Sequence, residues 1–232
     1  ALETVRDKRS RMPHICTRKL QGPVNAALTA CGLCPVGRDW LFDMLRSKGM
    51  LVEKRRRGPR TTNSYHRFGA YRNLIRLIQP TGPGQIVVSD ITYIRSDEGF
   101  AYLALVTDLY SRKILGWDVS DSLSVEGALR ALKMAQNGLG RTAGVIHHSD
   151  RGIQYCCTDY STSLEEATMI QSTTEIDHAA ENAVAERVNG ILKGELGLGE
   201  TFRDHAQIRR AVSEAVTIYN WERPHLSLDY NT

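Results

Sequence analysis

The sequence has no long apolar run and few cysteines. Among its 232 residues there is no stretch of 18 uncharged apolar residues and no signal-peptide pattern, so we expect no membrane-spanning or exported segment. The cysteines number five, and an odd count without a secretion signal favours a reducing compartment over a disulfide framework. The chain starts at Ala1 and stops at Thr232, which we interpret as a trimmed or processed chain.

Spacing typical of a zinc site occurs only once. Cys31 and Cys34 are separated by two residues, and His14 and Cys16 offer two further ligands. There is no second pair of this kind, and a loop that connects two helices accounts for Gly32. We therefore interpret this segment as a helix connection rather than a zinc site.

Charge is distributed unevenly along the chain. Residues 1–80 hold 17 Lys and Arg against 5 Asp and Glu, and residues 81–232 hold 13 against 21. These net charges of +12 and −8 give the total of +4. A polar joint with Pro and Gly at 79–84 separates the two parts. We predict a basic DNA-binding region at 1–80 with a linker to 84, a core at 85–200, and a C-terminal helix and tail at 201–232 packed on the core.

The basic region is predicted to be a small helical module. Helices are expected at 16–30 and 38–48, the second with its apolar residues, Trp40 among them, on one face. A helix, a turn, a helix and a basic arm form a layout typical of DNA-binding modules, and basic arms attract phosphates. A solvated linker is the alternative interpretation of the arm, which consists of Lys54, Arg55, Arg56 and Arg57.

The acidic part predicts an α/β domain with a mixed sheet. Apolar patterns and turn residues give strands near 85–95, 100–107 and 112–119, a helix at 124–137, a strand at 143–148 and a helix near 158–168. A weaker strand precedes a helix at 180–196, and a last helix spans 202–220. Three antiparallel strands followed by crossovers to parallel strands match this order.

Three acids stand out in this part. Asp90 lies inside an apolar strand, where a carboxylate is costly to bury unless a proton, a cation or hydrogen bonds offset it. Asp150 follows a strand end, and Glu186 lies 35 intervening residues later on the polar side of a helix. Two carboxylates about 4–5 Å apart repel by roughly 3–4 kcal/mol. Convergence therefore requires a cation, and carboxylates suit Mg²⁺ or Mn²⁺ rather than Zn²⁺. Separate solvation of each acid is the alternative.

The acids and the words around them resemble a known family. Asp90, Asp150 and Glu186, the last two with 35 residues between them, are similar to the D, D(35)E signature of retroviral-type integrases and insertion-sequence transposases. Longer words resemble the OrfB-type transposases of the insertion sequence three family, over about residues 15 to 232. They are SDITYI, YLALVTDLYSRKILGW, HHSDRGIQY, ENAVAERVNGILKGE and YNWERPHLSL.

The resemblance implies a fold and a chemistry. It implies an RNase H-like integrase core, α/β with a mixed five-stranded sheet, preceded by a basic helix-turn-helix-like domain. Asp90, Asp150 and Glu186 would be the catalytic residues and would hold two Mg²⁺ or Mn²⁺ ions for DNA cleavage to a 3′-OH and strand transfer. The expected partners are double-stranded DNA, as terminal inverted repeats and target, and further copies of the chain. The expected location is the bacterial cytoplasm, on the nucleoid.

Several other residues are expected to assist the acids. Lys193 lies two helical turns after Glu186 on the same face and is placed to bind a phosphate near the scissile bond. Asn182, four residues before Glu186, shares that face, and His148 and Asp108 are expected as supporting groups at strand ends. We interpret Arg223 and His225 as the end of a helix that docks on the core, with DNA contact as the alternative.

Two other functions are compatible with the sequence. One is a catalytically inactive or domesticated DNA-binding relative, and the other is an RNase H-like nuclease without joining activity. The chain departs from the family pattern in places: Val87 stands where Trp is usual, Cys156 and Cys157 replace small hydroxyl residues, and residues 171–174 are irregular. These departures leave room for a decayed copy, although none alters the three acids.

Overall fold

The computed structural model describes residues 1–52, 71–76, 78–175, 181–225 and 228. The predicted basic arm, Lys54, Arg55, Arg56 and Arg57, lies outside these residues. Three helices come first: α1 (Leu2–Arg11), α2 (Thr17–Ala30) and α3 (Arg38–Ser47). The latter two confirm the predicted helices within a residue at each end. Helix α1 was not predicted, because it is strongly polar and buries only Val5.

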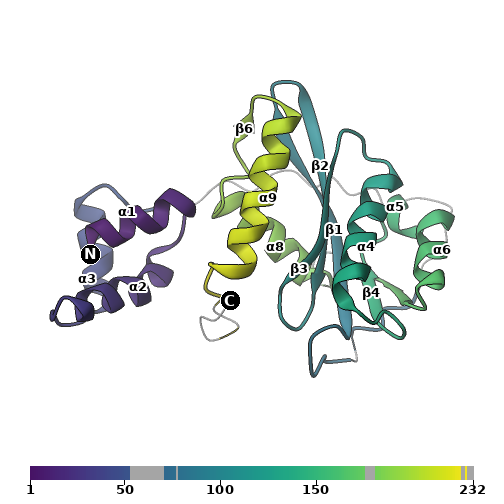
Figure 1. Ribbon diagram of the computed structural model, residues 1–232, viewed down its shortest axis with the longest axis horizontal. Coiled ribbons are helices and arrows are strands. Elements are labelled where there is room, and N and C mark those ends of the chain that lie inside the picture. The colour runs from purple at the N-terminus through teal and green to yellow at the C-terminus, as the bar shows by residue number, and fades with distance from the viewer. Residues whose placement is uncertain (53–70, 77, 176–180, 226–227, 229–232) are drawn as a thin grey trace.

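The three N-terminal helices pack as a small bundle beside the core (Figure 1). Val5, Leu20 and Leu41 are fully buried in one apolar cluster that continues into the core. The prediction of a single apolar face on α3 is wrong for Trp40, which is 51% exposed. The cysteines of the CxxC segment are exposed, and the 14 residues of α2 separate them from Cys16 by about 20 Å of helix.

A mixed sheet forms the centre of the molecule (Figure 1). Its strands are β1 (Ile86–Ser96), β2 (Gly99–Asp108), β3 (Ile114–Ser120), β4 (Ile146–Ser149) and β5 (Ile170–Thr173), in the order β3-β2-β1-β4-β5. Strands β1, β2 and β3 are antiparallel, and β4 and β5 run parallel to β1. The predicted five-stranded mixed sheet is confirmed, with an addition: the short strand β6 (Thr201–Phe202) pairs with the end of β1.

Alternation along the strands divides the apolar residues between two layers. On β2, Leu103 and Leu105 face the cluster under α8 (Ala183–Gly194) and α9 (His205–Trp221), and Ala104 and Val106 face the other cluster. The second layer contains α4 (Val125–Leu139), α5 (Ile153–Cys156) and α6 (Thr158–Glu166). Helix α4 approaches β3 closely at Gly116, where a Cβ atom would lie 2.0 Å from the backbone oxygen of Ala131.

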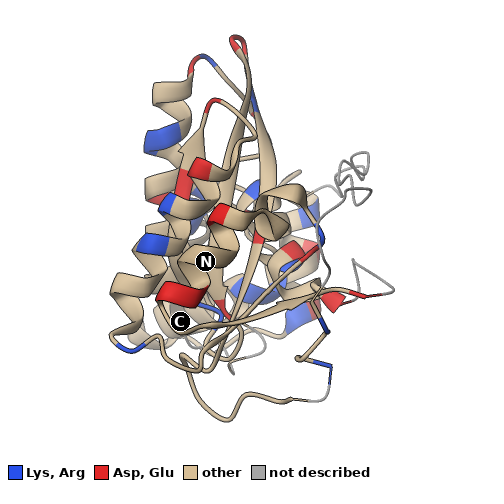
Figure 2. Cartoon of the chain, turned by 90° about the vertical axis from the view of Figure 1, so that its right-hand side faces the viewer, with Lys and Arg blue, Asp and Glu red and all other residues tan. Residues whose placement is uncertain are grey.

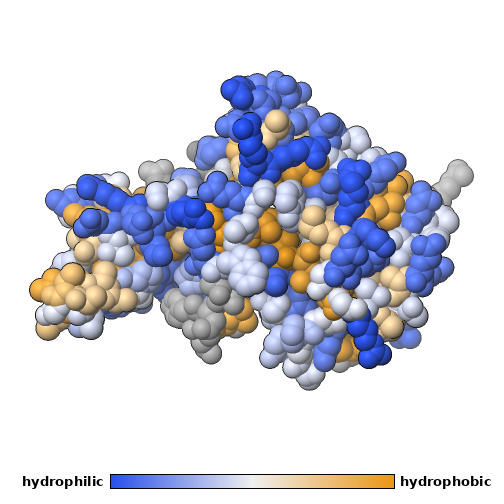
Figure 3. Space-filling model, viewed as in Figure 1, coloured by the Kyte–Doolittle hydropathy of each residue, from blue (hydrophilic) through white to orange (hydrophobic). Residues whose placement is uncertain are grey.

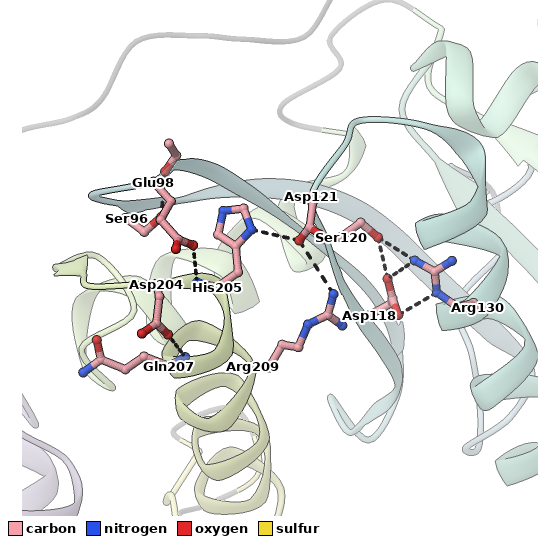
Figure 4. A network of polar contacts seen from close by, with 11 residues as sticks. Ser96, Glu98, Asp118, Ser120, Asp121, Arg130, Asp204, His205, Gln207 and Arg209 are labelled. Carbon is pink, nitrogen blue, oxygen red and sulfur yellow. Dashed lines mark hydrogen bonds and ion pairs between the residues drawn. The ribbon is translucent and has the colours of Figure 1, made fainter.

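Polar contacts hold the start of α9 against the tip of the sheet (Figure 4). The Asp204 carboxylate caps the helix by accepting the N–H of Gln207 at 2.7 Å. His205 Nδ1 lies 2.9 Å from the Asp121 carboxylate, and the His205 N–H donates to Glu98 Oε2 at 3.2 Å. The helix that covers the sheet is therefore fixed to both the β1–β2 hairpin and the segment after β3.

A buried ionic cluster joins the N-terminal helices to the core. The Glu195 carboxylate, just after α8, accepts bonds from Lys19 Nζ at 2.9 and 2.8 Å and from Arg223 Nε at 2.9 Å. Arg223 Nη1 also lies 3.1 Å from His225 Nδ1, and both side chains are buried. Arg223 and His225 therefore fasten the chain after α9 to α8, and their burial argues against the alternative of direct DNA contact.

Charged residues of both signs are interspersed on the side of the molecule that carries α4 and α6 (Figure 2). The face seen in Figure 3 is mostly hydrophilic, with apolar residues gathered in its centre and at the tip of the N-terminal helices. Among the described residues, no helix combines the length and apolar character that crossing a membrane requires.

We expect replacement of Glu195 by Gln to destabilise the whole chain. The change leaves Lys19 and Arg223 buried without their shared carboxylate, which costs about 3–5 kcal/mol and lowers Tm by roughly 6 to 20 °C. Thermal unfolding at neutral pH measures this, and Glu166→Gln, at an exposed acid on α6, is the matched control.

The same pair of proteins gives a pH test. Burial acts to raise the pKa of Glu195, but the hydrogen bonds and charges of Arg223 and Lys19 outweigh it, so the pKa lies below its usual value. Its contribution is complete above the ordinary Glu pKa of about 4.3 and is lost as pH falls through the lower folded value. The Tm difference between wild type and Glu195→Gln should therefore narrow below about pH 4. A constant difference from pH 7 to pH 3 would contradict this assignment.

Candidate active site

Strand β1 places Asp90 at the centre of the sheet on the side of α8. The side chain is partly buried, and both of its oxygens are held. Oδ1 accepts the N–H of Ile91 at 2.9 Å, and Oδ2 accepts Nδ2 of Asn189, on α8, at 2.7 Å. The preceding residue, Ser89, points to the opposite face, where its hydroxyl lies 2.8 Å from His147 Nε2.

The parallel pairing of β1 and β4 brings Asp150 beside Asp90. Ser89 and Ser149 are partners in this ladder, and each acid directly follows one of them. Asp150 is buried, and its Oδ1 accepts the N–H of Gly152 at 2.9 Å. A Cβ atom at Gly152 would lie 3.0 Å from that oxygen, so glycine lets the turn close over the carboxylate.

Two asparagines attach α8 to β1 and so position Glu186. Asn182, at the start of the helix, donates through Nδ2 to the backbone oxygen of Ser89 at 3.0 Å. Asn189 donates to Asp90. Glu186 lies between these anchors in the first turn of α8 and is exposed beside the other two acids. Asn182 thus contacts the residue before Asp90, and its supporting role in the site stays a prediction.

Asn189 was not among the predicted site residues, although its hydrogen bond to Asp90 makes it part of the site. A signal was present in the sequence: Asn189 follows Glu186 by three residues and so lies on the same helical face. The sequence did not say what this face meets. The Oδ1 atom of Asn189 is buried and has no hydrogen-bond partner among the described residues.

The electrostatics of Asp90 report the proximity of the other acids. Burial is the main cause that raises the pKa of Asp90 to about 7, followed by the negative charge of Asp150, with a smaller effect from Glu186. The bonds from Asn189 and Ile91 act in the opposite direction. Burial and the two neighbouring charges together therefore outweigh the hydrogen bonds that favour the charged form of Asp90.

The donor set fits a hard divalent cation. Within the described part of the chain, no three His, Cys, Asp or Glu side chains are gathered closely enough to enclose a metal ion. The three acids nevertheless offer carboxylate oxygens, the ligands that Mg²⁺ and Mn²⁺ prefer, and the charges of Asp150 and Glu186 both act on Asp90. A cation would also relieve the repulsion that raises the pKa of Asp90.

The two histidines before Asp150 lie below the site. Burial, with the charge of His148, lowers the pKa of His147 to about 3, and burial lowers that of His148 to about 4. Both rings are therefore neutral. His147 Nε2 lies 2.9 Å from the Tyr160 hydroxyl, and His148 Nδ1 lies 2.8 Å from Ser172 Oγ. They brace β4 against α6 and β5.

Lys193 lies near the acids, and Asp108 serves a turn. Burial lowers the pKa of Lys193, while the charge of Asp90 acts to raise it, so the ammonium is within electrostatic reach of that acid. Asp108 accepts the N–H of Gly84 at 2.7 Å and the N–H and hydroxyl of Ser111 at 2.6 and 2.7 Å. Its carboxylate therefore closes the β2–β3 turn.

Comparison with known proteins identifies the family. Residues 80–179 and 169–232 match two family descriptions, both named "Integrase core domain". The chain is 32% identical to an "Insertion element IS600 uncharacterized 31 kDa protein" of Shigella sonnei, over 94% of this chain and 81% of that protein. It is 35% identical to "Transposase InsF for insertion sequence IS3A" of Escherichia coli, over 81% of this chain and 62% of that one.

Other relatives are matched over a smaller part of their length. "Transposase for insertion sequence element IS629" of Shigella sonnei is 33% identical over 82% of this chain and 62% of its own. A "Putative transposase for insertion sequence element IS986/IS6110" of Mycobacterium tuberculosis is 36% identical, and 55% of it is covered. The chain thus spans a little over half of several relatives.

Solved structures agree in fold. The HTLV-2 integrase catalytic core domain, in complex with magnesium, superposes with a TM-score of 0.51 at 16% identity, over 63% of this chain and 92% of that one. The simian T-cell lymphotropic virus intasome gives a TM-score of 0.51 at 19% identity, over 87% of this chain and 65% of that one. The predicted RNase H-like fold is confirmed by these neighbours. The two family descriptions and the relatives establish that the chain belongs to the integrase-core transposases of the insertion sequence three family.

Proposed function

We propose that the protein is a DNA transposase that cuts a DNA strand to leave a 3′-OH and joins that end to target DNA at a single site. The observation that supports the proposal is electrostatic and concerns Asp90 in β1, Asp150 directly after β4 and Glu186 in α8. The charge of each of the other two acids acts on Asp90. Family membership supports the same reaction class. No observation favours an inactive relative or a nuclease without joining activity.

In this proposal the three acids would hold two divalent ions. When bound, such ions activate the attacking oxygen and stabilise the leaving oxygen at phosphorus. The chain's own groups prepare the site: Asn189 and the Ile91 N–H orient Asp90, and the Gly152 N–H orients Asp150. Held in this way, the carboxylates need little rearrangement, which favours catalysis by preorganisation.

Lys193 is proposed to bind a DNA phosphate beside the scissile bond. It lies near Asp90 and on the α8 face that carries Glu186, so a phosphate approaching the acids would meet its ammonium. An ammonium also offsets part of the repulsion between a phosphodiester and three carboxylates.

The basic region is proposed to supply most of the affinity for DNA. Residues 1–80 carry a net charge of +12, whereas residues 81–232 carry −8. We propose region 1–80 as the domain that binds the terminal inverted repeats, with the core and C-terminal helix as the catalytic part. Pairing of two DNA ends would require at least two copies of the chain, acting in the bacterial cytoplasm.

Metal binding is the first test of the site. Calorimetric titration with Mn²⁺ should show binding to the wild type and its loss in Asp150→Asn, because the substitution removes a charged ligand while keeping the shape. Asp159→Asn, at an exposed acid on α6, should bind Mn²⁺ as the wild type does. Equal binding by Asp150→Asn and the wild type would rule out this pair of ligands.

Cleavage and joining should share the same acid. Glu186→Gln is expected to lower donor nicking, and also joining of a pre-nicked donor, by on the order of a thousandfold, because a metal ligand supports several kcal/mol of transition-state stabilisation. Both reactions can be measured on duplexes that carry the ends of the element, with Mg²⁺ or Mn²⁺. Binding of these duplexes should persist.

Glu181, two residues before the first residue of α8, provides the comparison. Glu181→Gln should retain both reactions if Glu186 is the third acid. Activity in Glu186→Gln together with its loss in Glu181→Gln would mean that the wrong acid was chosen.

Neutralising the basic arm should weaken binding to duplexes of any sequence. Replacement of Arg55, Arg56 and Arg57 by Gln removes up to three phosphate contacts, so the slope of log affinity against log salt should fall by up to about three. Lys133→Gln with Arg141→Gln, two exposed positions in and beyond α4, should leave the slope unchanged. An unchanged slope in the arm variant would move the DNA-binding surface elsewhere.

A further inference from the structure

A hollow lined by several basic residues lies on a different flank of α8 from the one that carries Glu186. This hollow of about 310 Å³ is bounded by α8, the β2–β3 turn, the end of α9 and the chain after it. Val184, Val188 and Ile191 form an apolar wall, and Arg112 and Arg187 belong to its lining. Glu186, Asn189 and Lys193 are on a different face of the helix, so the hollow is distinct from the acid site.

Positive charge converges in this hollow. Its lining includes Lys19, Arg112, Arg187 and Arg223. Three of these cations act on one group: the charges of Arg223, Arg112 and Arg187 oppose the burial that raises the pKa of Tyr219 to about 12. The Tyr219 phenol thus stays protonated at neutral pH, and the Arg223 guanidinium carbon lies 5.7 Å from the centre of its ring.

Two of these cations have no carboxylate partner in the described structure. Glu195 bonds Lys19 and Arg223, so that single acid is shared between two cations. No described carboxylate forms an ion pair with Arg112 or Arg187, and Arg112 Nη1 is buried without a hydrogen-bond partner among the described residues. A buried cationic donor without a partner is costly. The hollow is therefore built for an anion.

The backbone holds Arg112 in place for such a role. Arg112 has a φ of +66°, uncommon for a residue with a side chain, and its N–H donates to the Asp108 oxygen at 3.0 Å. The Asp108 carboxylate fixes the same turn through Gly84 and Ser111. This closed turn carries the Arg112 side chain into the hollow.

We propose that this hollow binds one phosphate of the DNA backbone, held by Arg112 and Arg187 with the Tyr219 hydroxyl nearby. The inference rests on the proposed function and adds a DNA contact outside the acid site. One guanidinium group can donate two parallel N–H bonds to two oxygens of a phosphate. Arg187 directly follows Glu186 in α8, so the hollow and Glu186 lie on adjoining flanks of one helix. The apolar wall and a volume larger than a phosphate suit the attached sugar.

Anion binding can be tested without DNA or metal. Inorganic phosphate, titrated calorimetrically into the metal-free full chain, should bind the wild type and bind Arg112→Gln/Arg187→Gln at least tenfold more weakly. Arg187→Gln alone changes an exposed side chain, so it should fold normally and show part of the loss. Lys133→Gln/Arg141→Gln removes two charges elsewhere and should bind as the wild type does. Absence of binding by the wild type, or equal binding by Arg187→Gln, would overturn the inference.

Duplex binding separates DNA from other sources of phosphate. Occupation of the hollow by one phosphate predicts that the salt slope falls by about one in Arg112→Gln/Arg187→Gln and stays constant in Lys133→Gln/Arg141→Gln. A series of duplexes can carry one neutral methylphosphonate each, at a different position of the strand. At one position the neutral group should weaken binding by the wild type but not binding by Arg112→Gln/Arg187→Gln. An unchanged slope would overturn the assignment to DNA and leave a free phosphate or an acidic protein side chain as the occupant.

These measurements do not depend on catalysis. If the wild-type chain bound no metal ion or performed no strand transfer, the proposed function would be contradicted. The phosphate titration would still test the hollow. If the Arg187→Gln variant bound phosphate and DNA as strongly as the wild type does, the inference about the hollow would be contradicted. The proposal for the acid site would be unaffected.

Discussion

The site depends on a carboxylate buried where a sheet would otherwise carry an apolar side chain. Asp90 occupies the middle of the central strand, and its raised pKa measures how poorly that position favours a charge. The structure compensates in part with the Asn189 amide and the Ile91 N–H. The charges of Asp150 and Glu186 act in the same direction as burial and raise the pKa of Asp90 further. In the proposed function, divalent cations would offset these charges.

Helix α8 connects Asp90 and its strand to the N-terminal helices and to the chain after α9. Its first turn is attached to β1 through Asn182, and its middle contacts Asp90 through Asn189. Directly beyond its end, Glu195 binds Lys19 of the N-terminal helices and Arg223 of the chain after α9. A displacement of the N-terminal helices would therefore act on the same rigid element that presents Glu186. The flank of α8 with Arg187 provides a third contact surface.

The fold shows which of the basic residues are paired with an acid and which line the hollow. Lys19 and Arg223 contribute to the basic composition of the chain, yet they are buried and matched to Glu195. Arg112 and Arg187 belong to the part with a negative total, yet they concentrate positive charge in one hollow. Net charge by region therefore predicts long-range attraction to phosphate, but individual binding residues have to be assigned from contacts.

The sequence by itself determined most of the order of elements and distinguished three acids as candidates for the site. Alternating and helical apolar patterns are local, so the strands around Asp90 and the helices at residues 17–30 and 38–47 could be predicted within a few residues. Helix α1 escaped because its polar residues carry almost no apolar pattern. Strand β6 is only two residues long, and its pairing with β1 exists only in the assembled sheet.

Only the tertiary structure decided which residues meet. The pairing of Ser89 with Ser149, which brings Asp90 and Asp150 side by side, joins segments 60 residues apart. The contact of Asn189 with Asp90 and the sharing of Glu195 by Lys19 and Arg223 also join distant segments. Such contacts depend on packing between elements, which local patterns do not encode. Residue types, spacing and family resemblance therefore sufficed to propose a chemistry for the acids, whereas the amides that contact Asp90 and β1, the buried ionic cluster and the basic hollow required the fold.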